Sequence, residues 1–496
     1  MTAEAYGGGA RARARVKVVS GAGGGGNGGA GSRSAAWNSS KEISQEITNV
    51  DRLSSLPDDV LIAILDKLED TMDAVATTVL SRRYVQLPWQ INRPHLSASS
   101  SLLKALSPMR RFMASIEAME CLTLDFFLTD EFVSAIQHLL SNAIDSGRIQ
   151  ALCFEIRTML DGMEKTGEQM LEDTQRLLRF AGSSTNLFAS LKKLHLKNLW
   201  LIDSDIEVLL TTCRRLEELK LYHCNSSDGA VLVIDVPPQS ELKELEFRMC
   251  YYEQVELRSV PKLTRLTIKS WLYRPPLLLC LAPFLEGLSL TNSALRTSER
   301  FKLSELLAPT RNLSSISLNF ENQMIWIRPE DAQPLNYVFG NLTFLSLHRI
   351  FAECNLTWMM FLLKAAPCLE KFHVAIQRHS CCHPEDVINR MKTLHPKKTR
   401  VLWNDVDFKH TNLQKLEIFG FEPDDKCVKF ARLVMERSIR LEKVILCEEE
   451  LCIECNFEND ETFSTESWYP RSKDEKEFWE KKLIHGMSSR VKVFIL

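Results

Sequence analysis

The sequence has 496 residues, of which 45% are hydrophobic and 25% are charged, and its formal net charge is −3. This length and apolar fraction allow several domains or one extended repeat array with a substantial core. The near-zero charge provides no global field that would favour nucleic acid or a membrane surface as a partner. The longest apolar run, residues 277–285, contains Pro283 and is too short to span a bilayer.

Residues 1–45 are predicted to form a glycine-rich, disordered tail. Eleven of the 20 glycines precede Ser32, and such a segment cannot bury enough apolar surface to fold. This segment contains a short basic cluster of Arg11, Arg13, Arg15 and Lys17. The cluster could be a nuclear or organelle targeting signal, but a disordered solubilising tail is the favoured interpretation. We see no apolar secretion signal, so the 14 cysteines are expected to be reduced thiols in the cytosol or the nucleus.

Residues 51–89 have the pattern of a small helical module. Pro57 suits the first turn of a helix, with Ser55 as the expected capping residue. Apolar residues then recur at helical spacing, first over residues 60–68 and again over residues 72–80. About forty residues with this much apolar surface cannot bury all of it alone, so the surplus must lie against the following domain or a partner.

This module resembles an F-box in its plant form, DRLSxLPDxxLxxIL…AVxTxxLSRRW, over residues 51–84. It departs from that pattern at Tyr84, where tryptophan is usual, and at Asp66-Lys67. The resemblance implies an F-box over residues 48–92 that docks to the Skp-type adaptor of a cullin–RING ubiquitin ligase. It places these residues at or beside the adaptor: Leu53, Leu56, Pro57, Val60, Leu61, Ile64, Leu65, Val79 and Leu80. The residues alone also fit an amphipathic helical hairpin packed only on its own chain.

A leucine-rich repeat pattern follows a linker at residues 91–115 and is predicted to fill residues 115–400. Its unit, Leu-x-x-Leu-x-Leu, recurs every 21 to 29 residues except for one step of 44, a spacing typical of leucine-rich repeats. Each unit predicts a short strand whose apolar side chains face a shared core, so neighbouring units must stack. We therefore expect an α/β solenoid with a strand plus a helix or irregular segment per repeat. Weaker units begin at Met119 and Ile149, and clear ones at Leu191, Leu216, Leu242, Leu263, Leu285, Leu313, Leu342, Leu369, Leu413 and Leu441.

Residues 401–496 are predicted to continue the repeats. The stretch at residues 413–421 and an expected helix at residues 426–438 resemble the FBD region that follows the repeats in plant F-box proteins. An insertion at residues 377–407, with an expected helix at residues 384–394, precedes this region. The resemblance implies that F-box, repeats and FBD-like region form one substrate-receptor chain.

The sequence contains no catalytic motif and no complete metal site. Phosphate-binding, dinucleotide-binding, zinc-protease and nucleophile-elbow motifs are all missing, so we expect no enzyme activity and no cofactor. Cys452 and Cys455 form a single CxxC, whereas a structural zinc site needs four ligands. The cluster at residues 379–383, His-Ser-Cys-Cys-His, is too tight for zinc-finger geometry and is interpreted as a reduced polar loop.

The residues between the leucines of each strand should form one continuous outward surface. Its exposed positions mix signs, as at Lys193, Glu218 and Glu246, which argues against nucleic acid. Cys224 and Cys250 are expected to be buried small residues that satisfy loop amides. Aromatic and arginine side chains are the expected anchors for a protein target. The candidates are Tyr222, Arg248, Arg265 and Phe344, with His195 and His348 as weaker choices and the insertion or the ends of the array as alternative sites.

Together these features predict the substrate-recruiting F-box subunit of a Skp–cullin–F-box E3 ubiquitin ligase. Such a chain performs no chemistry and holds a target near the ubiquitin-charged enzyme. Its expected partners are the Skp-type adaptor, through it a cullin, and a protein target that the sequence does not name. The alternative is a leucine-rich-repeat scaffold or receptor, outside a ligase, that binds a protein or a small ligand.

Overall fold

The computed structural model describes residues 55–68, 71–77, 83–85, 87–91, 93–97, 118–160, 165–226, 230–271, 277–292, 301–322, 325–328, 330–378, 408–449, 468–487 and 491–496. Its helices and strands belong to one unit that spans Leu56–Leu496. Several predicted features lie outside the described residues: the glycine-rich tail, the insertion helix at residues 384–394, the cluster at residues 379–383, Cys452 and Cys455, and Leu53, Val79 and Leu80 of the adaptor-binding set.

A small helical module precedes the main sheet. It consists of α1 (Asp58–Leu65), α2 (Thr71–Ala76), η2 (Arg83–Val85) and η3 (Pro88–Gln90). Arg83 joins its end to its beginning, since the guanidinium donates to the Asp58 carboxylate at 2.7 Å and to the Leu56 carbonyl at 2.5 Å. The buried core of the module is formed by Leu61, Leu65, Ala74, Tyr84, Leu87 and Ile91.

Helix α1 begins later than predicted. Pro57 is its N-cap and no side chain caps the helix, so the predicted Ser55 cap is not formed. Asp58 and Asp59 occupy the first turn instead, where carboxylates interact favourably with the helix dipole. The start of α1 is therefore stabilised by charge and by the fixed φ of proline.

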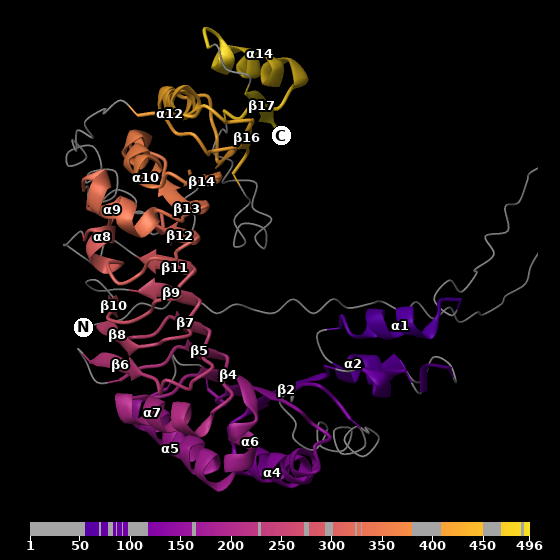
Figure 1. Ribbon diagram of the computed structural model, residues 1–496. Coiled ribbons are helices and arrows are strands. Elements are labelled where there is room, and N and C mark those ends of the chain that lie inside the picture. Colours follow the sequence, from indigo (N-terminus) through magenta and orange to yellow (C-terminus); the bar gives the residue numbers. More distant parts are fainter. Residues whose placement is uncertain are drawn as a thin grey trace, which may run out of the picture. The chain divides into compact units, whose positions relative to one another are not determined.

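Fourteen parallel strands form one sheet, in the order β1, β2, β3, β4, β5, β7, β9, β11, β12, β13, β14, β15, β16 and β17 (Figure 1). Every predicted repeat unit, clear or weak, supplies one strand, so the long parallel sheet of the predicted solenoid is confirmed. Two further strands were not predicted: β1 lies within the expected linker, and β17 ends the chain. The bounds are β1 (His95–Ser97), β2 (Leu122–Phe127), β3 (Leu152–Arg157), β4 (Leu191–Lys197), β5 (Glu218–Tyr222), β7 (Glu244–Arg248), β9 (Arg265–Trp271), β11 (Gly287–Asn292), β12 (Ser315–Asn319), β13 (Phe344–Phe351), β14 (Lys371–Gln377), β15 (Lys415–Phe419), β16 (Lys443–Cys447) and β17 (Lys492–Ile495).

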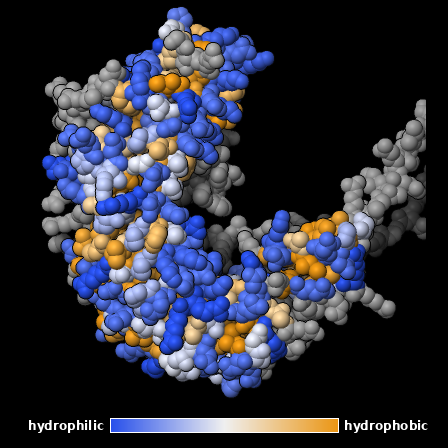
Figure 2. Space-filling model, viewed as in Figure 1, coloured by the Kyte–Doolittle hydropathy of each residue, from blue (hydrophilic) through white to orange (hydrophobic). Residues whose placement is uncertain are grey.

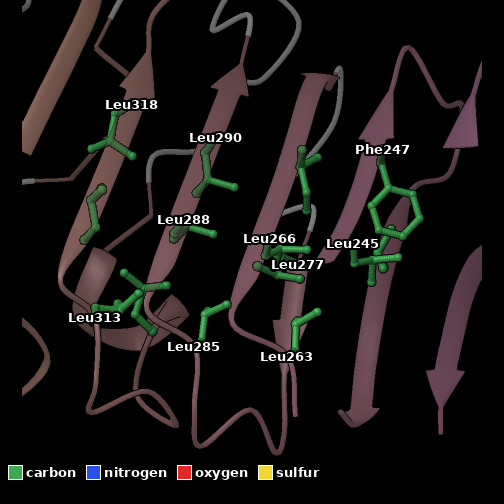
Figure 3. Packing of buried hydrophobic residues seen from close by; sticks show 14 of the residues in the cluster. Leu245, Phe247, Leu263, Leu266, Leu277, Leu285, Leu288, Leu290, Leu313 and Leu318 are labelled. Carbon is green, nitrogen blue, oxygen red and sulfur yellow. The ribbon is translucent and has the colours of Figure 1, made fainter. Parts of the chain in front are cut away.

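The inward side chains of these strands form continuous apolar ladders. Leu266, Leu288 and Ile316 are direct neighbours in register, and so are Leu290 and Leu318 on β11 and β12. Figure 3 shows how the leucines of successive units pack side by side beneath the sheet. A fully buried leucine contributes roughly 1.5–3 kcal/mol, and each unit obtains that burial only from its neighbours.

Helices and a second, smaller sheet cover one face of the main sheet and leave the other open (Figure 1). The small sheet has the order β10, β8, β6 and lies in the middle of the array. Only 16 residues separate the end of β7 at Arg248 from the start of β9 at Arg265, which leaves room for a strand rather than a helix and its turns. The bounds are α4 (Asp130–Asp145), α5 (Gly167–Ser183), α6 (Thr185–Ala189), α7 (Asp203–Thr212), β6 (Val231–Asp235), β8 (Gln254–Ser259), β10 (Leu277–Leu279), α8 (Leu303–Leu306), α9 (Ala332–Phe339), η4 (Leu356–Met359), α10 (Met360–Ala365), α12 (Asp425–Arg437) and α14 (Lys473–Ile484). Helix α12 confirms the helix expected at residues 426–438.

Several strands end in a left-handed corner. Asn198, His223 and Met249 have φ of 60°, 49° and 50°, and each donates its N–H to a carbonyl of the next strand at 2.9 to 3.0 Å. Gly420 occupies the same corner after β15, with φ of 69°. There a Cβ would lie 2.1 Å from the carbonyl oxygen of Ile376, so the backbone approach itself requires glycine.

Cys224 and Cys250 lie just inside two of these corners. Cys224 is buried and Cys250 is half-buried, in agreement with the expected small residues. Each thiol donates to backbone carbonyl oxygens. Cys224 donates to the Tyr222 carbonyl and Cys250 to the Leu221 carbonyl, at 3.5 and 3.4 Å between sulfur and oxygen.

Each edge of the main sheet is closed by a side chain from a helix. On β1, the outward N–H of His95 donates to the Thr71 hydroxyl of α2 at 2.8 Å. On β17, the outward N–H of Ile495 donates to the Glu480 carboxylate of α14 at 3.0 Å. Unpaired edge N–H groups are templates for further strands, and at these two positions the protein satisfies them internally.

Candidate binding surfaces

Helix α1 carries an exposed apolar stripe beside its buried one. Val60 and Ile64 are 39% and 42% exposed, and Leu68, three residues past the end of α1, is 38% exposed. We call Val60, Ile64 and Leu68 the α1 stripe; Figure 2 shows hydrophobic residues gathered over this helix. An uncovered stripe of this kind on a small module is typical of a docking surface.

The predicted adaptor-binding residues divide between this stripe and the module core. Leu61 and Leu65 are only 2% and 6% exposed and pack against Tyr84, so they support the surface from inside and do not form it. Leu56 is half-buried against the same core, and Pro57 is exposed. Leu68 was not in the predicted set, although its spacing of four residues from Ile64 was the available signal.

The main sheet presents a second surface, the open face, on the side opposite its covering helices. It is formed by the outward residues of each strand, which lie in register in three rows. The amino-end row runs through Lys193, Glu218, Glu244, Arg265, Gly287, Ser315, Phe344, Lys371, Lys415, Lys443 and Lys492. The middle row includes His195, Lys220, Glu246, Thr267, Ser289, Ser317, Ser346, His373, Glu417, Ile445 and Phe494. The carboxyl-end row includes Tyr222, Arg248, Lys269, Thr291, Asn319, His348, Phe419 and Cys447.

Glu218 is the centre of a charge network on the N-terminal half of the open face. Its carboxylate accepts from His195 at 2.9 Å, from Lys193 at 2.7 Å and from Lys220 at 2.5 Å. These bonds, led by the one from His195, hold the pKa of Glu218 far below its usual range. Burial opposes charging of His195, but hydrogen bonds to Glu155 and Glu218 raise its pKa above the ordinary value.

The network continues across the next strands. Glu246 contacts Arg248 on its own strand, and the ammonium groups of Lys220 and Lys269 lie 3.8 and 3.9 Å from its carboxylate. Glu218 and Glu246 are 5% and 9% exposed, so the prediction that both are exposed is wrong. Their side chains do point outward, but the longer basic side chains around them exclude water.

The four predicted target-binding residues do not lie together. Tyr222 and Arg248 are neighbours in the carboxyl-end row, with the guanidinium 5.3 Å from the ring centroid. Arg265 lies in the amino-end row and is paired with Glu244. Phe344 shares that row, but β11 and β12 separate it from Arg265. The set therefore spans opposite margins of the open face, and its role in binding stays a prediction.

The two weaker candidates have different surroundings. His195 belongs to the Glu218 network. His348 lies 2.7 Å from the Ser346 hydroxyl, and its ring centroid is 5.1 Å from that of His373. Burial, followed by the proximity of His373, lowers the pKa of His348 to about 4. His348 is therefore neutral at physiological pH, whereas the network favours the charged form of His195.

Sequence reasoning missed the C-terminal end of the open face. There four lysines follow one another along the amino-end row, and apolar side chains lie beside them. We call this set the C-terminal patch: Lys371, Lys415, Lys443, Lys492, Phe419, Ile445 and Phe494. The available signal was the lysine at the third position of successive units, as in Leu413-Gln-Lys415 and Leu441-Glu-Lys443.

Within the described residues, no group of three or more His, Cys, Asp or Glu side chains has the arrangement of a metal site. Among the helices of the described part, none is both long enough and apolar enough to cross a membrane.

Comparison with family models matches residues 177–469 to the LRR domain of At1g61320/AtMIF1. The chain belongs to this LRR-domain family. The match extends past residue 401 and so includes much of the predicted FBD-like region within the LRR domain. The F-box resemblance of residues 51–84 lies outside the matched range and stays a prediction.

A chain from the crystal structure of the Rad7 and Elc1 complex in yeast is also similar to this LRR protein. The two are 12% identical, with a TM-score of 0.29, over 79% of this chain and 88% of that chain. Comparison with curated proteins finds no match.

Proposed function

We propose that this LRR protein is the substrate-recruiting F-box subunit of a Skp–cullin–F-box E3 ubiquitin ligase. In this role the helical module binds the Skp-type adaptor, which connects it to a cullin, and the LRR domain binds the target protein. The chain contributes no chemical step and acts by raising the local concentration of the target near the ubiquitin-charged enzyme. It would work in the cytosol or the nucleus.

The α1 stripe is the observation that carries the proposal. The module buries Leu61 and Leu65 in its own core, yet it leaves Val60 and Ile64 of the same helix, and Leu68 just past its end, uncovered. A hairpin that packed only on its own chain would have no use for this second stripe. The stripe also lies within the segment whose residues match the F-box pattern.

The LRR domain supports the second half of the proposal. Parallel strands in common register present their outward side chains as one continuous surface, which is how repeat domains bind proteins. Tyr222, Arg248, Arg265 and Phe344 remain predicted target contacts on this surface.

Substitution of Val60 and Ile64 by aspartate tests adaptor docking. Both side chains are exposed, so the double variant V60D/I64D should fold, but it places two charges in an apolar interface. Burial of the two side chains is worth roughly 1.5–3 kcal/mol each, so capture of a co-expressed Skp-type adaptor and cullin should fall at least about tenfold.

The matched control is I202D/V208D, which changes the same residue types at the start and on the surface of α7. Ile202 and Val208 are 46% and 47% exposed, and this variant should capture the adaptor like the wild type. If V60D/I64D also captured the adaptor at wild-type strength, the ligase role would be wrong. A scaffold outside a ligase would then remain.

A further inference from the structure

The C-terminal patch has a row of cations that the described part of the chain leaves largely unpaired. Lys371, Lys415, Lys443 and Lys492 are direct neighbours in register on β14 to β17. Adjacent strands are about 4.8 Å apart, so the Cα atoms of the four lysines span only about 15 Å. Like charges placed directly opposite on neighbouring strands are destabilising, and an anionic partner would relieve that repulsion.

The carboxylates near this row leave most of it unpaired. Glu417 pairs with Lys415 at 2.7 Å and lies 3.9 Å from His373. Glu370 and Glu442 directly precede two of the lysines and are exposed. Among the described residues, however, no carboxylate lies within ion-pair distance of Lys371, Lys443 or Lys492. This contrasts with the N-terminal half, where Glu218 alone accepts from two lysines and a histidine.

An apolar strip accompanies the cationic row. Ile445 and Phe494 are neighbours in the middle row, and Phe494 is 39% exposed. Phe419 is half-buried, with its ring centroid 5.0 Å from that of His373. Ile445 lies two residues beyond Lys443 on the same face, or about 7 Å along the strand. Figure 2 shows hydrophobic residues beside hydrophilic ones at this end of the sheet.

We propose that the C-terminal patch binds an extended acidic segment of a partner protein that carries large aromatic or aliphatic side chains. The lysine row would pair with its carboxylates, and the strip of Phe419, Ile445 and Phe494 would take its apolar side chains. Nucleic acid fits less well, because Glu370, Glu417 and Glu442 would repel a continuous phosphate backbone and the apolar strip would stay unused. The inference deepens the proposed function, since it names the chemistry of the target.

A synthetic peptide probes the patch without knowledge of the natural partner. The probe is a fluorescent 14-residue peptide that alternates pairs of Asp or Glu with Phe or Leu, and it is titrated into the full chain by fluorescence anisotropy. Two comparison ligands are the same peptide with serine at every apolar position and a 14-nucleotide oligo-dT. We expect the first peptide to bind at least tenfold more tightly than either comparison ligand.

Charge reversal tests the lysines. The variant K443E/K492E changes two exposed side chains that have no carboxylate partner among the described residues, and it should weaken binding of the probe at least tenfold. The control K429E/K473E makes the same charge change on α12 and α14, away from the open face, and should leave the affinity within twofold of the wild type. F494A should weaken binding several-fold without altering the melting temperature. Adaptor capture should be unchanged in all three variants, so failure here is distinguishable from failure of the proposed ligase role.

Three outcomes would overturn the proposal. Equal loss of binding in K443E/K492E and in the control would mean that net charge, and not the lysine row, determines the affinity for the probe. Affinity for oligo-dT or for the serine peptide equal to that for the probe would make the patch a general anion surface. Binding of the probe only after residues 451–466 are replaced by a Gly-Ser linker would show that the chain's own acidic stretch, and not a partner, is the natural occupant.

Discussion

The two halves of the open face use one backbone arrangement for opposite purposes. From β4 to β9, carboxylates such as Glu218 and Glu246 are enclosed by basic neighbours, and their charges are neutralised by ion pairs within the protein. From β14 to β17, lysines line one row with a single carboxylate partner in the part of the chain that the structure describes, and apolar side chains lie beside them. The comparison teaches that an outward position in a repeat does not by itself supply a binding residue. What matters is whether the neighbouring strand already satisfies its charge.

The strand corners give the largest expected effect. In the N-terminal half they hold residues with side chains, such as Asn198 and His223, whereas the corner after β15 requires glycine. G420A should lower the free energy of unfolding by about 3 kcal/mol or more, since alanine is strained at this φ and its Cβ meets the Ile376 carbonyl oxygen. Gly147 is the matched control, with φ of 71° and no atom within 4 Å of the position that a Cβ would take. G147A should cost only about 1–2 kcal/mol. Urea denaturation followed by circular dichroism measures both, and equal losses would mean that contact with Ile376 does not matter.

Removal of the central carboxylate tests the charge network itself. E218Q keeps the shape of the side chain but loses charge-assisted hydrogen bonds from His195, Lys193 and Lys220, so it should destabilise the protein by about 2 kcal/mol. The corresponding change in the C-terminal half, E417Q, removes one lysine partner and should cost less than about 1 kcal/mol. Chemical denaturation at constant pH compares the two. A larger loss from E417Q would reverse the contrast between the halves.

The pH dependence gives the smallest expected effect, and its sign differs between two histidines. His195 has a raised pKa in the folded protein, so its stabilising effect is present below pH about 6.5 and is lost as the pH rises through the folded value. His348 has a pKa lowered to about 4, so the protein loses stability as the pH falls from about 6.5 toward that value. H195Q should therefore cost more at pH 5.5 than at pH 8.5. H348Q should reduce the acid sensitivity by about 1 kcal/mol, after allowance for its partial exposure.

Unfolding curves of the wild type and both variants at pH 5.5, 7 and 8.5 would measure these differences. Parallel pH profiles for the three proteins would contradict both assignments, because neither histidine would then change its protonation on folding.

The repeat strands were predictable because each unit carries its own signal. Leucines at alternating positions, repeated along the chain, fix both the strand and the face that it buries. Strands β1 and β17 lack that unit. The three residues of β1 are too few to show a period, and the alternation of Val491, Val493 and Ile495 at the chain end was not recognised.

The site features depend on register, which the sequence does not display. Glu218 is buried because Lys193 lies directly beside it on β4 and because His195, two residues further along β4, contacts its carboxylate. The lysine row joins Lys443 to Lys492, which are 49 residues apart. On α1, the spacing of apolar residues predicted that the helix is amphipathic. It did not show that Leu61 and Leu65 are buried in the module core whereas Val60 and Ile64 are exposed. Local periodicity therefore predicts elements, whereas charge pairing and surface exposure require the strand neighbours.

The closed edges of the sheet have a practical consequence for experiments that disable the helical module. Thr71 of α2 satisfies the outward N–H of His95 on β1, so this module also serves as the end cap of the repeat array. Truncation before β1 would uncover that edge and create a site for self-association, which would confound any loss of partner binding. Substitutions on the α1 stripe leave Thr71 in place, and they can therefore separate docking from aggregation where a deletion cannot.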